Sequence, residues 1–299
     1  MNALHQAQLS LFPDMPLPVM PQHSKVINVA SVPQRSPFRY PGGKTWLVPT
    51  ARKWFRQADK TSELIEPFAG GGIISLTAIA ENYFSHATMV EIDDDMAAAW
   101  QTIFSDDNCD WLVQKVKTFV VTAEDINQSI IYADNGTKER GFATIVRNRT
   151  NHGGILAKGS GLIKSGEGGR GLASRWYPST LAKRIKEANL LREKITFVHG
   201  DAFKIMEQHL ADSNTFFFID PPYTVAGKRL YNHYDVDHRR IFELASQMKG
   251  HFLLTYDDTE EVRALADSFS LPYRTIPMQT THLITKEELL ISDNFEWLD

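Results

Sequence analysis

Four consecutive residues, Asp220-Pro221-Pro222-Tyr223, directly follow an apolar run that ends at Ile219. Two prolines end a strand and remove two backbone N–H donors, so nearby carbonyl groups are left to accept hydrogen bonds. A carboxylate, a carbonyl and an aromatic ring are thereby held rigidly where the strand ends. This set could accept both protons of a base amino group at Asp220 and the Pro221 carbonyl, while Tyr223 stacks on the extruded base. Taken alone, the tetrapeptide is equally typical of a strand that prolines merely end.

A second candidate site is the segment Glu66-Pro67-Phe68-Ala69-Gly70-Gly71-Gly72, between a short strand and a helix. Glycines there let the backbone turn sharply and approach a ligand closely. Glu91 ends the next strand, 20 positions after Gly71, and a carboxylate at that spacing can accept the hydroxyls of a ribose. The glycines alone favour a tight turn, and Glu91 alone could equally cap a helix. Their joint placement favours a site for a nucleoside without a pyrophosphate.

Charge is unevenly distributed along the 299 residues, whose formal net charge is −4. Residues 138–194 hold 13 Lys/Arg against 4 Asp/Glu. A basic segment in an acidic protein is typical of a phosphate-binding surface, although many charge runs are only solvated faces. Nine of the 18 glycines lie between Gly141 and Gly171. That density is unfavourable in a packed helix, so we expect a mobile loop that contacts nucleic acid.

The elements that must position these residues alternate between apolar strands and amphipathic helices. This order predicts an α/β fold of the doubly wound class, with a mostly parallel, Rossmann-like sheet. The run 216–219 is apolar throughout, as in a strand covered on both faces. Strands are expected at 63–66, 87–91, 195–199, 216–219 and 251–256, and helices at 73–82, 94–104, 178–193, 237–248 and 259–267. Residues 280–293 could form a β-hairpin at the sheet edge.

Two stretches depart from this alternation and divide the chain. Residues 1–36 carry five of the 14 prolines and are expected to form a flexible tail. Residues 37–105 and 195–299 would form the catalytic domain, and residues 106–194 an inserted subdomain.

The single cysteine, Cys109, rules out an intrachain disulfide and suits a reducing cytoplasm. No apolar stretch is long enough to span a membrane.

The motifs and their order resemble the Dam-type (α-group) adenine-specific DNA methyltransferases. Residues 38–44, an aromatic followed by x-Gly-Gly-Lys, resemble the family's N-terminal cofactor motif. Residues 66–72, 200–203 and 220–223 resemble its glycine, cofactor-adenine and catalytic motifs. Glu91-Ile92-Asp93 lies where the family usually has Asp-Ile-Asn, a conservative departure. Together these motifs span about residues 37–225.

The resemblance implies a site-specific adenine DNA methyltransferase that uses S-adenosyl-L-methionine, needs no metal and methylates the 6-amino group of a flipped adenine. Asp201 would bind the cofactor's adenine amino group, with Phe203 against the ring, and Lys44 would also brace the catalytic loop. The catalytic residues implied are Asp220, Pro221, Pro222 and Tyr223. The cofactor-binding residues implied are Tyr40, Gly43, Lys44, Glu66, Phe68, Gly70, Glu91, Asp201, Phe203 and Asp220.

Residues 126–181 occupy the position of the family's target-recognition region. Arg147-Asn148-Arg149 resembles the Asn-Arg found there, but the downstream Asn-x-Pro pattern of GATC-methylating members is missing. The target sequence is therefore left open, while double-stranded DNA is the expected partner. Candidate DNA-binding residues are Arg147, Arg149, Lys158, Arg170 and Arg175.

The tail contains Gln8-Leu9-Ser10-Leu11-Phe12, which resembles the peptide by which bacterial replication and repair proteins dock on the DNA sliding clamp. An extended peptide with Leu and Phe anchors can fill a surface pocket, although an incidental apolar pentamer is about as good an interpretation.

The main alternative for the whole protein is an RNA base methyltransferase of the same fold. A DNA-binding module that has lost activity is a second alternative, against which the intact motifs at 40–44 and 220–223 argue.

Overall fold

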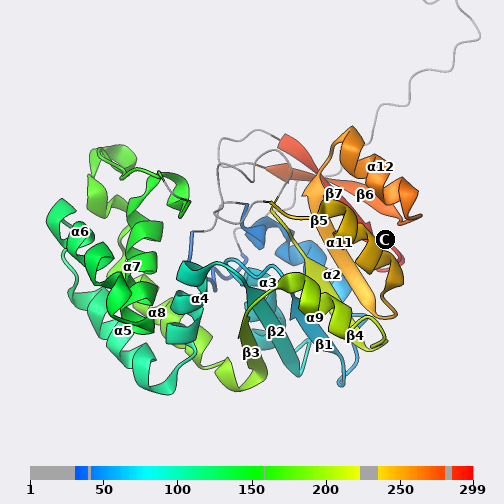
Figure 1. Ribbon diagram of the computed structural model, residues 1–299, viewed down its shortest axis with the longest axis horizontal. Helices are drawn as coiled ribbons and strands as arrows, with labels where there is room; N and C mark the ends of the chain where they lie inside the picture. Colours follow the sequence, from blue (N-terminus) through cyan, green and yellow to red (C-terminus); the bar gives the residue numbers. More distant parts are fainter. Residues whose placement is uncertain (1–30, 40–41, 158, 223–234, 280–284, 299) are drawn as a thin grey trace, which may run out of the picture.

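The computed structural model describes residues 31–39, 42–157, 159–222, 235–279 and 285–298. Within these residues, seven strands form one sheet in the order β3-β2-β1-β4-β5-β7-β6 (Figure 1). Neighbours from β3 to β5 are parallel, and β7 is antiparallel to both β5 and β6. The strands are β1 Glu63–Glu66, β2 His86–Glu91, β3 Ile195–His199, β4 Thr215–Ile219, β5 His251–Asp257, β6 Tyr273–Gln279 and β7 Thr285–Ser292. The expected doubly wound, mostly parallel α/β class is confirmed.

Helices cover both faces of this sheet because its central strands are apolar on both sides. On β4, Phe216 and Phe218 pack into one core with Trp54, whereas Phe217 and Ile219 pack into a second core. The first face is covered by α2 Val48–Phe55, α3 Ile73–Ala80 and α4 Asp94–Ile103. The second is covered by α9 Ala202–Gln208, α11 His238–Gln247 and α12 Glu260–Ser268. A short 3-10 turn, η1 Lys44–Leu47, leads into α2.

The residues between α4 and β3 form a group of helices beside the sheet, at the left of Figure 1. They are α5 Asp106–Thr118, α6 Ala123–Ile131, α7 Thr137–Thr150 and α8 Pro178–Asn189, with 3-10 turns η2 Tyr132–Asn135, η3 His152–Gly154, η4 Glu167–Gly169, η5 Leu172–Arg175 and η6 Arg192–Lys194. Helix α7 packs along α4. A Cβ at Gly141 would lie 2.8 Å from the Ala98 carbonyl oxygen, so this glycine permits the close contact of the two helices. The expectation of a loop is therefore wrong for residues 137–150, which are helical.

The glycine-rich stretch after α7, residues 153–171, passes so close to Arg39 at Gly154 that only glycine fits there. Gly154 has φ +76, and a Cβ there would lie 2.3 Å from the Arg39 carbonyl oxygen. The Asn148 amide ties the same region together, since its Nδ2 donates to the carbonyl oxygens of Arg39 and Gly154, 3.0 Å away in each case. The stretch is thus anchored to Arg39, which belongs to the residue 38–44 motif.

Three further predictions need correction at their boundaries. Of the predicted tail, residues 31–36 are described, and Val32 packs in the core with 5% exposure. A hairpin does lie at the sheet edge, but its first strand begins at Tyr273, ahead of the predicted range 280–293. The helix predicted at 178–193 ends at Asn189. Among the described residues, no helix has the length and apolar character needed to cross a membrane.

Candidate active site

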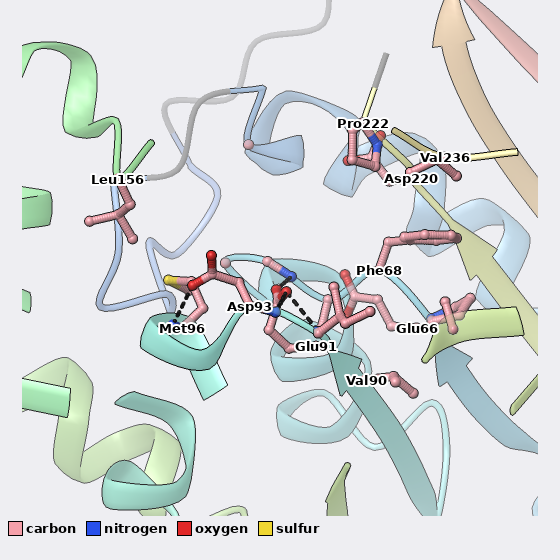
Figure 2. Close-up of a pocket in the computed structure, with 18 of the residues that line it drawn as sticks. Glu66, Phe68, Val90, Glu91, Asp93, Met96, Leu156, Asp220, Pro222 and Val236 are labelled. Carbon is pink, nitrogen blue, oxygen red and sulfur yellow. Dashed lines mark hydrogen bonds between the residues drawn. The ribbon is translucent and has the colours of Figure 1, made fainter. Parts of the chain in front are cut away.

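A cavity of about 400 Å³ opens at the carboxyl ends of β1, β2 and β4. In doubly wound sheets, ligands bind where neighbouring crossovers run in opposite directions, which here is between β1 and β4. Figure 2 shows Leu156 at one side of the cavity and Asp220 with Pro222 at the other. Leu156 belongs to the glycine-rich stretch, so that stretch forms part of the cavity wall. Most of the predicted cofactor-binding residues line this cavity, namely Gly43, Lys44, Glu66, Phe68, Gly70, Glu91, Asp201, Phe203 and Asp220.

The glycine turn between β1 and α3 forms the floor of this cavity. Gly72 precedes α3 with φ +61, and a Cβ there would lie 2.5 Å from the Met89 side chain. The Trp100 indole N–H donates to the Gly70 carbonyl oxygen at 2.8 Å. The left-handed conformation favours glycine at position 72, and the Trp100 ring, 3.0 Å from such a Cβ, leaves little room for a side chain. The turn therefore has a fixed shape against which a ligand can lie.

Glu91 connects the end of β2 to this turn. Its Oε2 accepts from the Gly70 N–H at 3.1 Å, and its Oε1 accepts from the N–H groups of Ile92 and Asp93 at 3.0 Å. Burial raises the pKa of Glu91 to about 7, because these hydrogen bonds only partly offset the loss of solvent. The helix-cap interpretation applies to Asp93 instead, whose Oδ1 accepts from the first turn of α4. Among the described residues Oε2 accepts a single hydrogen bond, so this oxygen retains acceptor capacity for a ligand.

Glu66 supplies a second buried carboxyl group, at the end of β1. Its Oε2 accepts from the backbone N–H of Ser75 at 3.0 Å and from the Ser75 hydroxyl. Burial raises the pKa of Glu66 to about 8, and the nearby Asp220 charge adds to the shift. A cationic ligand would favour the ionised forms of both buried carboxyl groups. This end of the cavity is thus suited to positive charge.

Aromatic rings line another part of the cavity. Phe68 and Phe203 meet edge to face, with ring centroids 6.4 Å apart. Asp201 caps α9, and its Oδ1 accepts from the Phe203 N–H at 2.9 Å. A flat, apolar ring with a polar edge can lie against such phenyl groups and present its edge to a carboxylate. Binding of a cofactor adenine by Asp201 and Phe203 stays a prediction.

Asp220 follows β4 and is held by two contacts from other elements. Lys44 Nζ lies 2.8 Å from Asp220 Oδ1, and the Thr255 hydroxyl on β5 donates to the same oxygen at 2.8 Å. Burial lowers the pKa of Lys44, but the carboxylates of Asp220 and Glu288 outweigh this effect and hold the pKa above its usual value. The ammonium group therefore stays charged at neutral pH. The predicted contact between Lys44 and the catalytic tetrapeptide is present in the structure, while its role in bracing stays a prediction.

Several predicted site residues cannot be placed. Tyr40, Lys158 and Tyr223 lie outside the described residues, as does the Gln8–Phe12 peptide. Pro221 is buried, and Pro222 lines the cavity.

The predicted DNA-binding arginines lie in different environments. Arg147 donates to Asp95 Oδ2 and to the Leu156 carbonyl oxygen, both at 2.6 Å. Arg149 is 6% exposed and donates to the Pro37 carbonyl oxygen; burial and the charges of nearby arginines lower its pKa to about 10. Arg175 is half-buried and Arg170 is exposed. Contact of these residues with DNA stays a prediction, for which Arg170 has the most accessible position.

Three polar residues near the site were not predicted, namely Ser75, Thr255 and Glu288. Thr255 and Glu288 come from strands that carry no motif, and a single polar residue in an apolar run is a weak signal. The register explains their position, because Thr255 follows Leu254, which pairs with Ile219, and Glu288 pairs with Asp257. Only the folded sheet brings Thr255 to Asp220 and Glu288 to Lys44.

The fold and the site define a Rossmann-like methyltransferase. A model of the D12 class N6 adenine-specific DNA methyltransferase family matches residues 40–278, and the chain belongs to that family. No match is found among curated protein sequences.

Solved structures similar to the chain include three methyltransferases. The rRNA methyltransferase AviRa from Streptomyces viridochromogenes has 9% identity and a TM-score of 0.41, covering 90% of this chain and 94% of its own. A putative RNA methyltransferase from Pyrococcus horikoshii has 12% identity and a TM-score of 0.38, covering 85% of each chain. Precorrin-6y C5,15-methyltransferase from Geobacter metallireducens has 9% identity and a TM-score of 0.36, covering 83% of this chain and 86% of its own.

Proposed function

We propose that the protein transfers a methyl group from S-adenosyl-L-methionine to the 6-amino group of adenine in double-stranded DNA. The observation that carries this proposal is the fixed carboxylate of Asp220 at the edge of the cavity. Within the part of the chain that the structure describes, its hydrogen bond and ion pair both fall on Oδ1. Its other oxygen, Oδ2, can serve as an acceptor for a base. The family match supports adenine as that base.

The cavity fits the proposed cofactor. A volume of about 400 Å³ lies within the usual range for small-molecule sites. Glu66 and Asp220 suit the positive charges of its sulfonium and amino groups, Glu91 suits its ribose, and Asp201 with Phe203 suits its adenine. When bound, the cofactor would supply an activated methyl group: the base nitrogen would bond to the methyl carbon as the carbon–sulfur bond breaks to leave a neutral thioether, and the nitrogen would then lose one proton to solvent.

The protein's own residues prepare the base for this exchange. An aromatic amino group is a poor nucleophile, because its lone pair is delocalised into the ring. Acceptance of its two protons by Asp220 Oδ2 and the Pro221 carbonyl would draw the nitrogen toward a tetrahedral geometry. Asp220 thus acts by orienting the nitrogen and by stabilising positive charge that develops on it. The target atom is inaccessible inside a duplex, so the adenine must first leave the base stack.

The inserted helices and the glycine-rich stretch are the proposed DNA-binding region. Residues 138–194 carry the excess of positive charge, and exposed basic residues such as Arg170 and Lys164 lie in the stretch that also forms the cavity wall. Lys and Arg that neutralise phosphates release counterions, so binding should weaken steeply as salt is added. DNA held by this stretch would lie beside the opening of the cavity.

The choice of acceptor can be tested directly. Purified protein is incubated with tritiated S-adenosyl-L-methionine and either plasmid DNA or total RNA, and the labelled nucleoside is identified after digestion. We expect label in DNA as N6-methyladenine. Label confined to RNA would instead support the alternative of an RNA base methyltransferase and overturn the DNA proposal.

A further inference from the structure

Glu288 is a buried carboxylate that contacts the site from a strand outside the family match. It is 3% exposed, and its Oε1 lies 3.3 Å from Lys44 Nζ. The match ends at residue 278, before β7 begins. None of the sequence motifs includes this residue. Burial of a carboxylate is costly unless a partner compensates for the lost solvation, so a buried glutamate beside a functional lysine calls for a physical explanation.

Because β7 is antiparallel to β5, this carboxylate lies at the edge of the sheet where the parallel strands have their carboxyl ends. Glu288 pairs with Asp257 at the carboxyl end of β5, and the following residue pairs with Tyr256. The start of β7 therefore lies where the parallel strands end, next to Asp220. Leu289, Leu290 and Ile291 follow and are fully buried, so the strand that carries Glu288 is firmly anchored in both cores.

Lys44 lies between two carboxylates, at 2.8 Å from Asp220 and 3.3 Å from Glu288. Its ammonium group also donates to the Gly42 carbonyl oxygen at 3.1 Å. If Asp220 were its only carboxylate partner, the Lys44 ammonium would form a simple ion pair that neutralises the Asp220 charge. With Glu288 as a second partner, the ammonium is shared between two carboxylates, so part of the negative charge of Asp220 is left at the edge of the cavity. That charge favours the positive charge that develops on a methylated nitrogen.

We propose that Glu288 is a positioning residue that holds the Lys44 ammonium between two carboxylates, so that Asp220 stays both oriented and negatively charged toward the substrate. The effect on methyl transfer rests on the proposed function, whereas the effect on Lys44 does not. Other charged or titratable groups that act on this cluster are Asp257 beside Lys44 and Glu66 beside Asp220. Tyr256, which is fully buried on β5, also interacts with Asp220.

The main test compares Glu288→Gln with Glu287→Gln, its exposed neighbour on the same strand. We expect Glu288→Gln to lower kcat by roughly 10-fold to 100-fold, by analogy with outer-shell residues that orient metal ligands. The Kd of S-adenosyl-L-methionine should stay within about twofold of the parent. The fall of kcat at alkaline pH should begin at lower pH, because one of the two charges that keep Lys44 protonated is gone. Glu287→Gln should match the parent in kcat, in the Kd of the cofactor and in the alkaline limb of the pH profile.

A nitrogen NMR titration of the Lys44 side chain in the ligand-free protein supplies a readout that is independent of activity. We expect Glu288→Gln to lower the pKa of Lys44. An unchanged pKa, or a lowered pKa with parental kcat and pH profile, overturns the proposal. If the parent binds the cofactor but methylates no DNA, the proposed function fails while the Lys44 titration still decides the role of Glu288 in holding the ammonium.

Glu288→Asp covers the case in which the glutamine variant does not fold. It keeps the charge but moves it away from Lys44 by one methylene group. We expect an intermediate kcat, an unchanged cofactor Kd and an alkaline limb close to that of the parent. A parental kcat in this variant would contradict a positioning role.

Discussion

The Thr255 hydroxyl donates a 2.8 Å hydrogen bond to Oδ1 of Asp220. Thr255 is fully buried on β5, and the register that pairs Leu254 with Ile219 brings it beside the end of β4. A threonine on a strand without any motif thus restrains the rotation of the Asp220 carboxylate. This contact separates the two oxygens of Asp220 into one held by the protein and one that can serve a substrate.

Thr255→Val should lower kcat while leaving the cofactor Kd nearly unchanged. Valine keeps the volume of threonine but cannot donate to Asp220. A hydrogen bond to a charged group contributes about 1.5 to 3 kcal/mol, so we expect kcat to fall by about 10-fold or more. Steady-state kinetics and calorimetry check this, with the exposed Thr275→Val on β6 as control. A parental kcat in Thr255→Val would show that Asp220 needs no such support.

The sequence predicts the sheet well because its central strands are short, apolar and separated by clear turns. All-apolar residues at 216–219 and the glycines at 70–72 place Asp220 and the cavity floor correctly. The sequence does not predict Thr255 and Glu288, because their role depends on strand register and on the antiparallel direction of β7. Glycine count was misleading for Gly141, where close packing of α7 on α4, rather than a loop, requires the residue.

Cofactor binding should depend on pH through the buried carboxyl groups of the cavity. Burial raises the pKa of Glu66 to about 8 and that of Glu91 to about 7. A cationic ligand favours their ionised forms, so affinity should rise with pH until the pH passes these free-state pKa values of about 7 and about 8, with release of protons on binding. Calorimetry in two buffers of different ionisation enthalpy measures both effects. Glu66→Gln should reduce the slope of log affinity against pH. An affinity that is independent of pH in the parent would contradict the account.

The same groups predict how the stability of the ligand-free protein depends on pH. Their folded-state pKa values lie above the usual value of 4.5. The folded state then retains protons that the unfolded state releases, so stability should fall as pH rises from about 4.5 to about 8. Thermal unfolding of Glu66→Gln should show a smaller fall than the parent over this range. An equal fall in both proteins would mean that Glu66 does not titrate in the folded state as described.

The alanine variants of Arg147 and Arg170 should lose different properties. Arg170 is exposed, so its loss should weaken DNA binding and reduce the slope of log affinity against log salt by about one. Arg147 instead joins Asp95 to the Leu156 carbonyl at the cavity wall, so its loss should lower Tm and weaken cofactor binding. Filter binding over a salt series, thermal unfolding and calorimetry separate the two. The assignment is wrong if Arg170→Ala keeps the parental salt slope.

The N-terminal peptide Gln8–Phe12 should bind a bacterial sliding clamp. A synthetic peptide of residues 1–20 is titrated against purified clamp, and a peptide with Leu11→Ala and Phe12→Ala serves as control because it lacks the two apolar anchors. We expect saturable binding of the first peptide alone. Absence of binding at high micromolar concentration would remove the clamp as a partner.

Asp220→Ala tests the central claim most directly, through tritiated-methyl transfer to duplex DNA alongside separate measurements of cofactor and DNA binding. The account predicts that DNA binding persists while methyl transfer falls by about 100-fold or more, because the acceptor that orients the amino nitrogen is gone. Transfer near the parental rate would contradict it.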